Sequence, residues 1–233
     1  HIVADYINKN ILSQAYIHVE PRGMETDEQL ESFKENLRIF SLTRTEFFLS
    51  EGLEINVEFE DGSIKARVTV IGTLMLLLQG ISSYKDFREG LQLLYSDAKW
   101  LSDAIISESL YQTKAKHHDV IRVEARTGII GSIHKVFNKL ESIKRGAKGA
   151  MLATDIVDKI DDAQNEILKL MDNICDLADK DLVAKECIAL VKELPETPVP
   201  PKDKENKIYA IDEYRRKKSN LISAIEIHLM ADE

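Results

Sequence analysis

Alternation of apolar and polar residues is the clearest pattern in the first third of the chain. Residues 13–20, SQAYIHVE, alternate in this way, which is the period of a half-buried strand. Residues 54–71 show the same alternation on both sides of Asp61-Gly62, a dipeptide that favours a tight hairpin turn. Acidic residues of the first hairpin strand would face basic residues of the second, which stabilises such a pair. The pattern predicts a strand and a β-hairpin.

Helical spacing dominates most of the remaining chain. Thr26 is followed by acidic residues and then by apolar residues three and four apart, which predicts an N-capped helix. The same spacing recurs towards the C-terminus. Further helices are predicted over about residues 86–111, 129–143 and 207–230. Residues 150–194 are predicted to form one long helix or two.

Together these elements predict an α+β fold that is mostly helical. We expect a mixed domain over residues 1–148, which contains the hairpin 54–71, and a helical region over residues 149–233, built as a hairpin or bundle. Three of the five prolines fall in residues 196–206, which predicts a linker before the last helix.

An uncharged run at residues 68–84, VTVIGTLMLLLQGISSY, raises the question of a membrane span. A spanning helix needs about 20 predominantly apolar residues. The run is shorter, its first residues continue the hairpin strand, and Gly72 and four later polar or glycine positions interrupt it. It is therefore predicted to lie in a protein core.

Composition narrows the class of protein. Hydrophobic residues make up 44% and charged residues 30% of the chain, as is typical of soluble globular proteins. The formal net charge of −9 argues against a dedicated nucleic-acid binder. The two cysteines lie twelve residues apart, which suits neither a zinc knuckle nor a redox pair and predicts reduced thiols in a cytoplasmic protein.

One segment departs from this acidic balance. Residues 114–148 carry nine lysines and arginines and three carboxylates. This basic surface is a candidate docking site for an acidic protein, a small anion or a membrane surface. Candidate residues for binding an anion or a partner are Arg122, Arg126, His134, Lys135, Lys139, Lys144 and Arg145.

Within the basic segment, residues 128–145 predict a cationic amphipathic helix, a composition typical of interfacial helices. Gly128 and Gly131 could also free backbone amides for an anion at the helix start. The GIIGSIHK sequence lacks the spacing of a phosphate-binding Walker loop. An ordinary surface helix with solvated lysines explains the same pattern.

No catalytic residue, metal ligand set or cofactor is predicted. His117 and His118 are adjacent and would point about 100° apart on a helix, and no zinc-ligand spacing links them to His134. Cys175 falls near the apolar stripe of its predicted helix, where a buried, inert thiol is expected.

A heptad seam marks residues 153–177, where apolar residues step by three and four without interruption. Such a seam favours a coiled coil, either as an oligomer interface or as packing within one chain. The candidates for self-association are Ile156, Ile160, Ile167, Leu170, Ile174 and Leu177.

Three classes of function follow from these features. The first is a non-enzymatic interaction or assembly protein that pairs with itself or with a protein partner through residues 153–177. The second is a membrane-surface or membrane-disrupting effector that uses residues 128–145. The third is a sensor or enzyme that binds an anion or nucleotide at Arg122, Arg126, His134 and Lys135.

Overall fold

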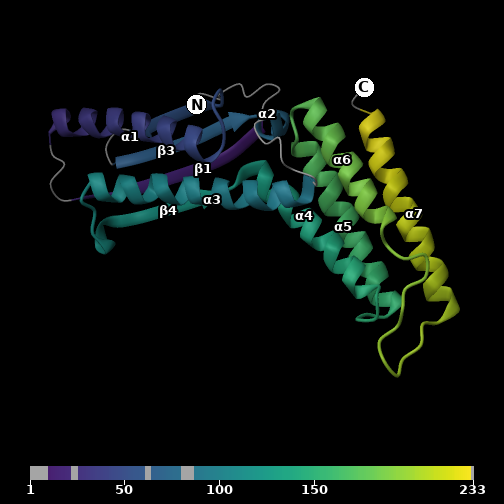
Figure 1. The fold of residues 1–233 in the computed structure, drawn as a ribbon. Helices are drawn as coiled ribbons and strands as arrows, with labels where there is room; N and C mark the ends of the chain where they lie inside the picture. The colour runs from purple at the N-terminus through teal and green to yellow at the C-terminus, as the bar shows by residue number, and fades with distance from the viewer. Residues whose placement is uncertain (1–9, 22–25, 61–63, 80–86, 232–233) are drawn as a thin grey trace. The chain divides into compact units, whose positions relative to one another are not determined.

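The computed structural model describes residues 10–21, 26–60, 64–79 and 87–231. The chain divides into two compact units, residues 1–131 and 132–233. In chain order the elements are β1 (Asn10–Val19), α1 (Asp27–Phe48), β2 (Glu54–Glu60), β3 (Ile64–Gly72), α2 (Leu74–Gln79), α3 (Phe87–Gln112), a 3₁₀ turn (His117–Asp119), β4 (Val120–Arg126), α4 (Gly128–Gly146), α5 (Ala153–Asn173), α6 (Leu177–Lys192) and α7 (Ile208–Met230) (Figure 1). The division falls within α4, earlier than the boundary near residue 148 that the sequence suggests.

The first unit is built on a four-stranded antiparallel sheet with the order β2-β3-β1-β4. Apart from the short α2, its elements follow one another as β1-α1-β2-β3-α3-β4. This connectivity and strand order are those of the ferredoxin-like, or split βαβ, motif. The predicted α+β class is confirmed.

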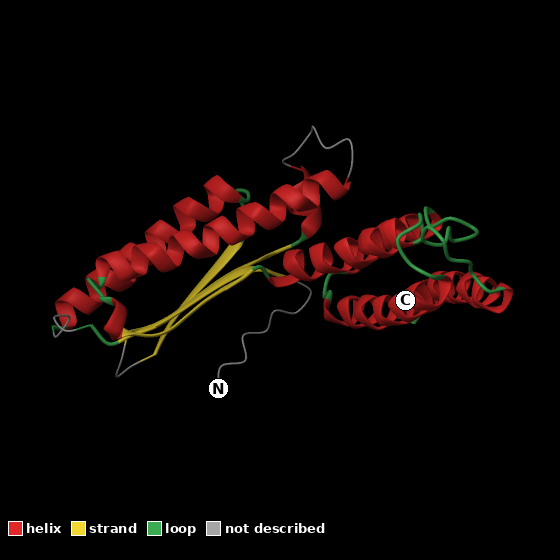
Figure 2. Cartoon of the chain, turned by 90° about the horizontal axis from the view of Figure 1, so that it is seen from below, coloured by secondary structure: helices red, strands yellow, loops and turns green. Residues whose placement is uncertain are grey.

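Helices α1 and α3 lie on the same face of this sheet (Figure 2). Alternate residues of β1, among them Ala15, Ile17 and Val19, are buried beneath these helices. Phe33 and Leu37 of α1 are buried as well. The helices therefore bury one face of the sheet and leave the polar residues of the strands on the other.

The hairpin and the first helix form for the reasons that the sequence suggests. Lys65 Nζ lies 3.2 Å from a Glu60 carboxylate oxygen, and Arg67 Nη1 lies 3.3 Å from one of Glu58. Thr26 Oγ1 accepts a hydrogen bond from the backbone N–H of Gln29 at 3.3 Å and caps α1. The predicted Asp61-Gly62 turn lies outside the described residues.

The uncharged run at residues 68–84 splits between two elements. Its start belongs to β3 and its middle forms α2, while residues 80–84 lie outside the described part of the chain. Val68, Leu74 and Leu77 are buried, as expected of a core segment. Among the described residues, none of the helices has both the length and the apolar character to cross a membrane.

One strand was missed in the sequence. Residues 120–126 lie in the stretch that was interpreted as helical from residue 86 onward, yet they form β4 and pair with β1. Their charges drew attention to the basic surface and away from the alternation of VIRVEAR. The period of two is nevertheless present there.

The second unit is helical. The apolar residues of α4, including Ile133, Val136 and Leu140, are buried. Helix α5 packs against α7, and α6 also contacts α7. Residues 150–194, predicted as one helix or two, form α5 and α6. Asp176 caps α6 by accepting a hydrogen bond from the Asp179 N–H at 2.8 Å.

The predicted linker is held near both of its ends: Arg215 of α7 donates to the Thr197 hydroxyl at 2.8 Å, and Asn206 donates to the Pro198 carbonyl at 2.9 Å. The residues just before it are held as well. Lys218 Nζ of α7 donates to the Leu194 carbonyl at 2.8 Å, and the Tyr214 hydroxyl donates to the Pro195 carbonyl at 2.6 Å. Asn206 accepts a hydrogen bond from the Ala153 N–H at 2.8 Å, so it also covers the start of α5. Side chains of α7 thus hold the proline-rich segment in place.

A candidate binding site on the open sheet face

Alternation along the strands gathers polar side chains on the sheet face opposite α1 and α3. The register sets three polar residues of β1, namely Gln14, Tyr16 and His18, in the middle of this face. Gln14 lies opposite Thr69 and Arg126, Tyr16 opposite Arg67 and Glu124, and His18 opposite Lys65 and Arg122. None of the helices that the structure describes in the first unit covers this face (Figure 2). We call it the open sheet face.

A small hollow of about 130 Å³ lies at the centre of the open sheet face. A water molecule takes about 30 Å³ in the liquid, so the hollow has room for about four waters. This size suits one phosphate or carboxylate group. The hollow is lined by Gln14, Tyr16, Arg67, Arg122, Glu124 and Arg126.

Tyr16 organises two of the lining arginines. The guanidinium carbons of Arg67 and Arg122 each lie 5.7 Å from the centroid of the Tyr16 ring. Both distances fall within the range of a cation–π contact. Because these arginines come from the strands on either side of β1, the ring brings together two charges from β3 and β4.

Glu124 is the one carboxylate among the lining residues. It forms ion pairs with both Arg122 and Arg126 on its own strand. Hydrogen bonding from Arg122 is the main cause that lowers the pKa of Glu124 below its ordinary value, with a further contribution from Arg126. Three arginines and one ionised glutamate give the lining a formal charge of +2.

Two further polar residues of β1, Gln14 in the lining and His18 beside it, belong to the same face. Gln14 donates a hydrogen bond to the Thr69 hydroxyl at 3.0 Å, which fixes its amide on the sheet. The Nε2 atom of His18 is covered and has no hydrogen-bond partner among the described residues.

The other predicted anion-binding residues lie in the second unit, on α4. Lys135 and Lys139 both pair with Glu166 of α5, at 3.5 and 2.8 Å. Lys144 pairs with Glu141 and Glu193. Burial lowers the pKa of His134, which favours its neutral form. Arg145 is exposed in the last turn of α4.

Gly128 has a packing role at the start of α4. Its φ is +49°, and a Cβ atom there would lie 2.1 Å from the Ile11 carbonyl oxygen of β1. The backbone of β1 therefore occupies the space beside this glycine. The Gly131 amide donates to the Thr127 carbonyl at 3.0 Å, and the anion cradle suggested for Gly128 and Gly131 stays a prediction.

The heptad seam is used within the second unit. Ile156, Ile160, Ile167 and Leu170 of α5 are buried. The helix ends at Asn173, so the seam does not continue to residue 177 as one helix. Ile174 is buried after that end, whereas Leu177 begins α6 and is 62% exposed. Self-association through the seam remains a prediction, and it would require the packing of α5 against α7 to open.

The histidines and cysteines form no reactive cluster in the part of the chain that is described. No group of three or more His, Cys, Asp or Glu residues there could hold a metal ion. His118 lies 3.3 Å from Asp119 in the 3₁₀ turn. The prediction for Cys175 was wrong, because the helix ends before it and its thiol is exposed, while Cys187 is buried.

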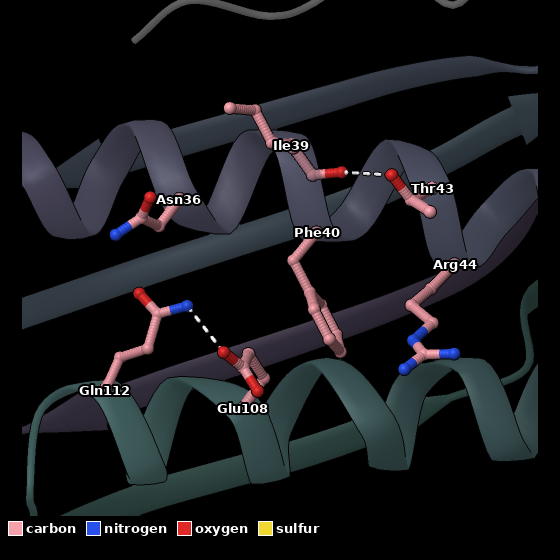
Figure 3. Close-up of a pocket in the computed structure, with 7 residues that line it drawn as sticks. All are labelled: Asn36, Ile39, Phe40, Thr43, Arg44, Glu108 and Gln112. Carbon is pink, nitrogen blue, oxygen red and sulfur yellow. Dashed lines mark hydrogen bonds between the residues drawn. The ribbon is translucent and has the colours of Figure 1, made fainter.

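A larger, shallow groove of about 590 Å³ lies between α1 and α3. Asn36, Phe40 and Arg44 of α1 point towards α3, whereas Ile39 and Thr43 point away from it (Figure 3). On α3, Gln112 donates a hydrogen bond to Glu108 at 2.7 Å. The Arg44 guanidinium carbon lies 5.2 Å from the Phe40 ring centroid. Among the lining residues of this groove the charged ones are one arginine and one glutamate, Arg44 and Glu108, so it lacks the clustered charge of the open sheet face.

Sequence reasoning identified two of the residues that line the hollow, Arg122 and Arg126, and missed Gln14, Tyr16, Arg67 and Glu124. The signal for the missed residues was present in the strand alternation, which marks them as outward-facing. What was lacking was the strand order, which sets β1 between β3 and β4. No protein-family model, curated protein or solved structure matches the chain.

Proposed function

We propose that the protein is a non-enzymatic binding protein that recognises a phosphate- or carboxylate-bearing ligand on the open sheet face. The observation that carries this proposal is the convergence of Arg67, Arg122 and Arg126 around Tyr16 in one hollow. Arginine is the side chain best suited to such ligands, because its planar fork of N–H donors matches their oxygens.

The charge of the site stands out against that of the whole chain. The lining carries +2 while the protein carries a formal net charge of −9. An acidic protein repels anions in general, so a local cluster of cations favours an anion at one place. This contrast favours a specific site over a general affinity for polyanions and agrees with the expectation that nucleic acid is not the ligand.

The site keeps donors for a ligand even though its arginines have partners. Each guanidinium has five N–H donors, whereas Glu124 offers two oxygens to Arg122 and Arg126 together. In the absence of a ligand, Glu124 holds these two side chains against the sheet. A bound anion would share or replace this carboxylate and gain charge-assisted hydrogen bonds.

The environment of Glu124 supports binding more than catalysis. A general acid or base works best when its pKa lies near the working pH. The arginines move the pKa of Glu124 in the opposite direction, further below neutrality. Its role is therefore to orient the guanidinium groups.

The alternative surfaces support the other hypotheses less well. The apolar side of α4 is buried, so in this state it has no apolar face to insert into a membrane interface. The isoleucines of the seam are buried as well. Within the first unit, none of the described helices covers the open sheet face.

Calorimetric titration with pyrophosphate tests the proposal. Each charge-assisted hydrogen bond contributes about 1.5–3 kcal/mol, so Arg126→Ala should weaken binding by about 10- to 100-fold. Arg67→Ala should have an effect of the same order, because Arg67 also lines the hollow, from β3 on the other side of β1.

Arg216→Ala is the matched control, because Arg216 is an exposed arginine that pairs with a glutamate, Glu213, on α7. It should bind pyrophosphate as the unaltered protein does. Titration with a glutamate-rich peptide and with single-stranded DNA identifies the source of the anion. Equal loss of affinity in Arg216→Ala and Arg126→Ala would contradict a localised site.

A further inference from the structure

Strand β4 is an edge strand among the described residues, and several of its side chains are exposed on both faces even though α3 contacts it. It pairs with β1 on one side and ends the sheet on the other. On the helix side, Ile121 is 55% and Val123 is 39% exposed. On the open sheet face, the side chains of Arg122 and Arg126 are 60% and 59% exposed. An edge strand with exposed apolar residues is a template for pairing with another chain.

The opposite edge of the sheet is protected. Strand β2 carries Glu54, Glu58 and Glu60 along one face. A helix contacts each edge strand, α1 against β2 and α3 against β4, so the two edges differ in their charges. Antiparallel pairing of β2 with a copy of itself would bring glutamates opposite glutamates or asparagines. Like charges directly opposite destabilise a strand pair, so β2 disfavours self-pairing and β4 does not.

The charges of β4 are complementary to those of its own antiparallel copy. On the open sheet face the strand reads Arg122, Glu124, Arg126. When a two-fold axis passes through Val123, Arg122 of each copy lies opposite Glu124 of the other. On the helix side, Val123 then meets Val123 of the second copy and Ile121 meets Ala125, so exposed apolar side chains cover one another.

We propose that a second copy of this chain binds along β4 in this register and extends the sheet from four strands to eight. The axis is perpendicular to the sheet, so the helical layers of both copies lie on the same side. The pair of strands is formed by residues 120–126 of each copy. This inference does not rest on the anion site, although Arg122 and Glu124 take part in both.

Neighbouring registers are less favourable. An axis at Glu124 brings the two Glu124 side chains together and sets Arg122 opposite Arg126. An axis at Arg122 brings the two Arg122 side chains together. An axis at Ala125 restores opposite charges, but it pairs Val123 with Thr127, which lies beyond the end of β4. Of the registers compared, the one centred on Val123 keeps residues 120–126 paired along the whole strand while it sets Arg122 opposite Glu124; Arg126 then lies opposite Val120.

The predicted association is weak, because one pair of strands forms a small interface. Interfaces below about 1,200 Å² are typical of transient complexes. We expect a dissociation constant on the order of 10 μM, and therefore a monomer–dimer equilibrium that depends on concentration. The dimer has twice the sequence mass of 26.5 kDa.

Sedimentation equilibrium at protein concentrations below and above the expected dissociation constant tests the register, using variants in which the charges of Arg122 and Glu124 are reversed. Arg122→Glu alone places a carboxylate opposite Glu124 of the second copy, and Glu124→Arg alone places two arginines opposite each other. Each change should weaken dimerisation by at least about tenfold. The double swap, Arg122→Glu with Glu124→Arg, restores opposite charges and should return the dissociation constant to within about threefold of the original.

Two further variants keep the result decisive. Val123→Lys places two like charges at the axis and should also abolish the dimer, without changing the open sheet face. Arg67→Glu is the matched control, because it reverses a charge on the same face but on an inner strand, and it should leave dimerisation unchanged. Circular dichroism establishes that each variant is folded. A protein that stays monomeric throughout, or a double swap as weak as the single changes, would overturn the proposal.

Discussion

At the scale of single residues, Lys218 illustrates how a buried charge can hold a loop. Its side chain is 9% exposed, and its ammonium group donates to the Leu194 carbonyl and to a Glu196 carboxylate oxygen at 2.6 Å. Glu196 is itself 84% exposed, so the ion pair is screened by water. The hydrogen bond to the buried carbonyl is therefore the larger contribution.

Lys218→Ala should lower the free energy of unfolding by about 2 kcal/mol, because it leaves the Leu194 carbonyl without this donor. Urea denaturation measures the change. Arg216→Ala, two residues away on the exposed side of α7, should change the free energy by less than about 0.5 kcal/mol. Equal effects of the two substitutions would refute the role given to Lys218.

The two cysteines should differ sharply in reactivity. Burial raises the pKa of Cys187 to about 12, so its reactive thiolate is scarce near pH 8. Cys175 is exposed. Titration of the folded protein with Ellman's reagent should give one rapidly reacting thiol per chain, and denaturation should release the second. Two rapid thiols in the folded protein would show that Cys187 is accessible.

At the scale of elements, Gly128 joins β4 to α4 at a point where only glycine fits. Gly128→Ala should destabilise the protein by about 1–3 kcal/mol, because it combines a positive φ with a collision against the Ile11 carbonyl. Chemical denaturation measures this loss. An unchanged midpoint would mean that β1 and α4 can separate there without cost.

The sequence predicted individual helices and strands better than it predicted which of them pack against one another. The hairpin and the Thr26 cap depend on residues close together in the chain, and both are present. Strand β4 was missed because its charges were interpreted as part of a helical basic surface. The heptad of α5 was recognised, but no pattern within the seam distinguishes packing against α7 from packing against a second chain.

At the scale of the whole molecule, the candidate site depends on strand order. The residues of the site belong to three strands that are far apart in sequence: Gln14 and Tyr16 to β1, Arg67 to β3, and Arg122 and Arg126 to β4. They meet because β1 lies between β3 and β4. Pairing over such separations is set by the fold as a whole, so local patterns identified two arginines of the site but not the tyrosine between them.

The central claim is that an anion binds among the arginines of the open sheet face. The most direct measurement is the NMR titration of arginine side-chain Nε–Hε signals with pyrophosphate. We expect the signals of Arg67, Arg122 and Arg126 to shift together and to saturate with one dissociation constant, while those of Arg215 and Arg216 on α7 remain in place. Shifts spread evenly over all arginines, or none at Arg67, Arg122 and Arg126, would contradict the account.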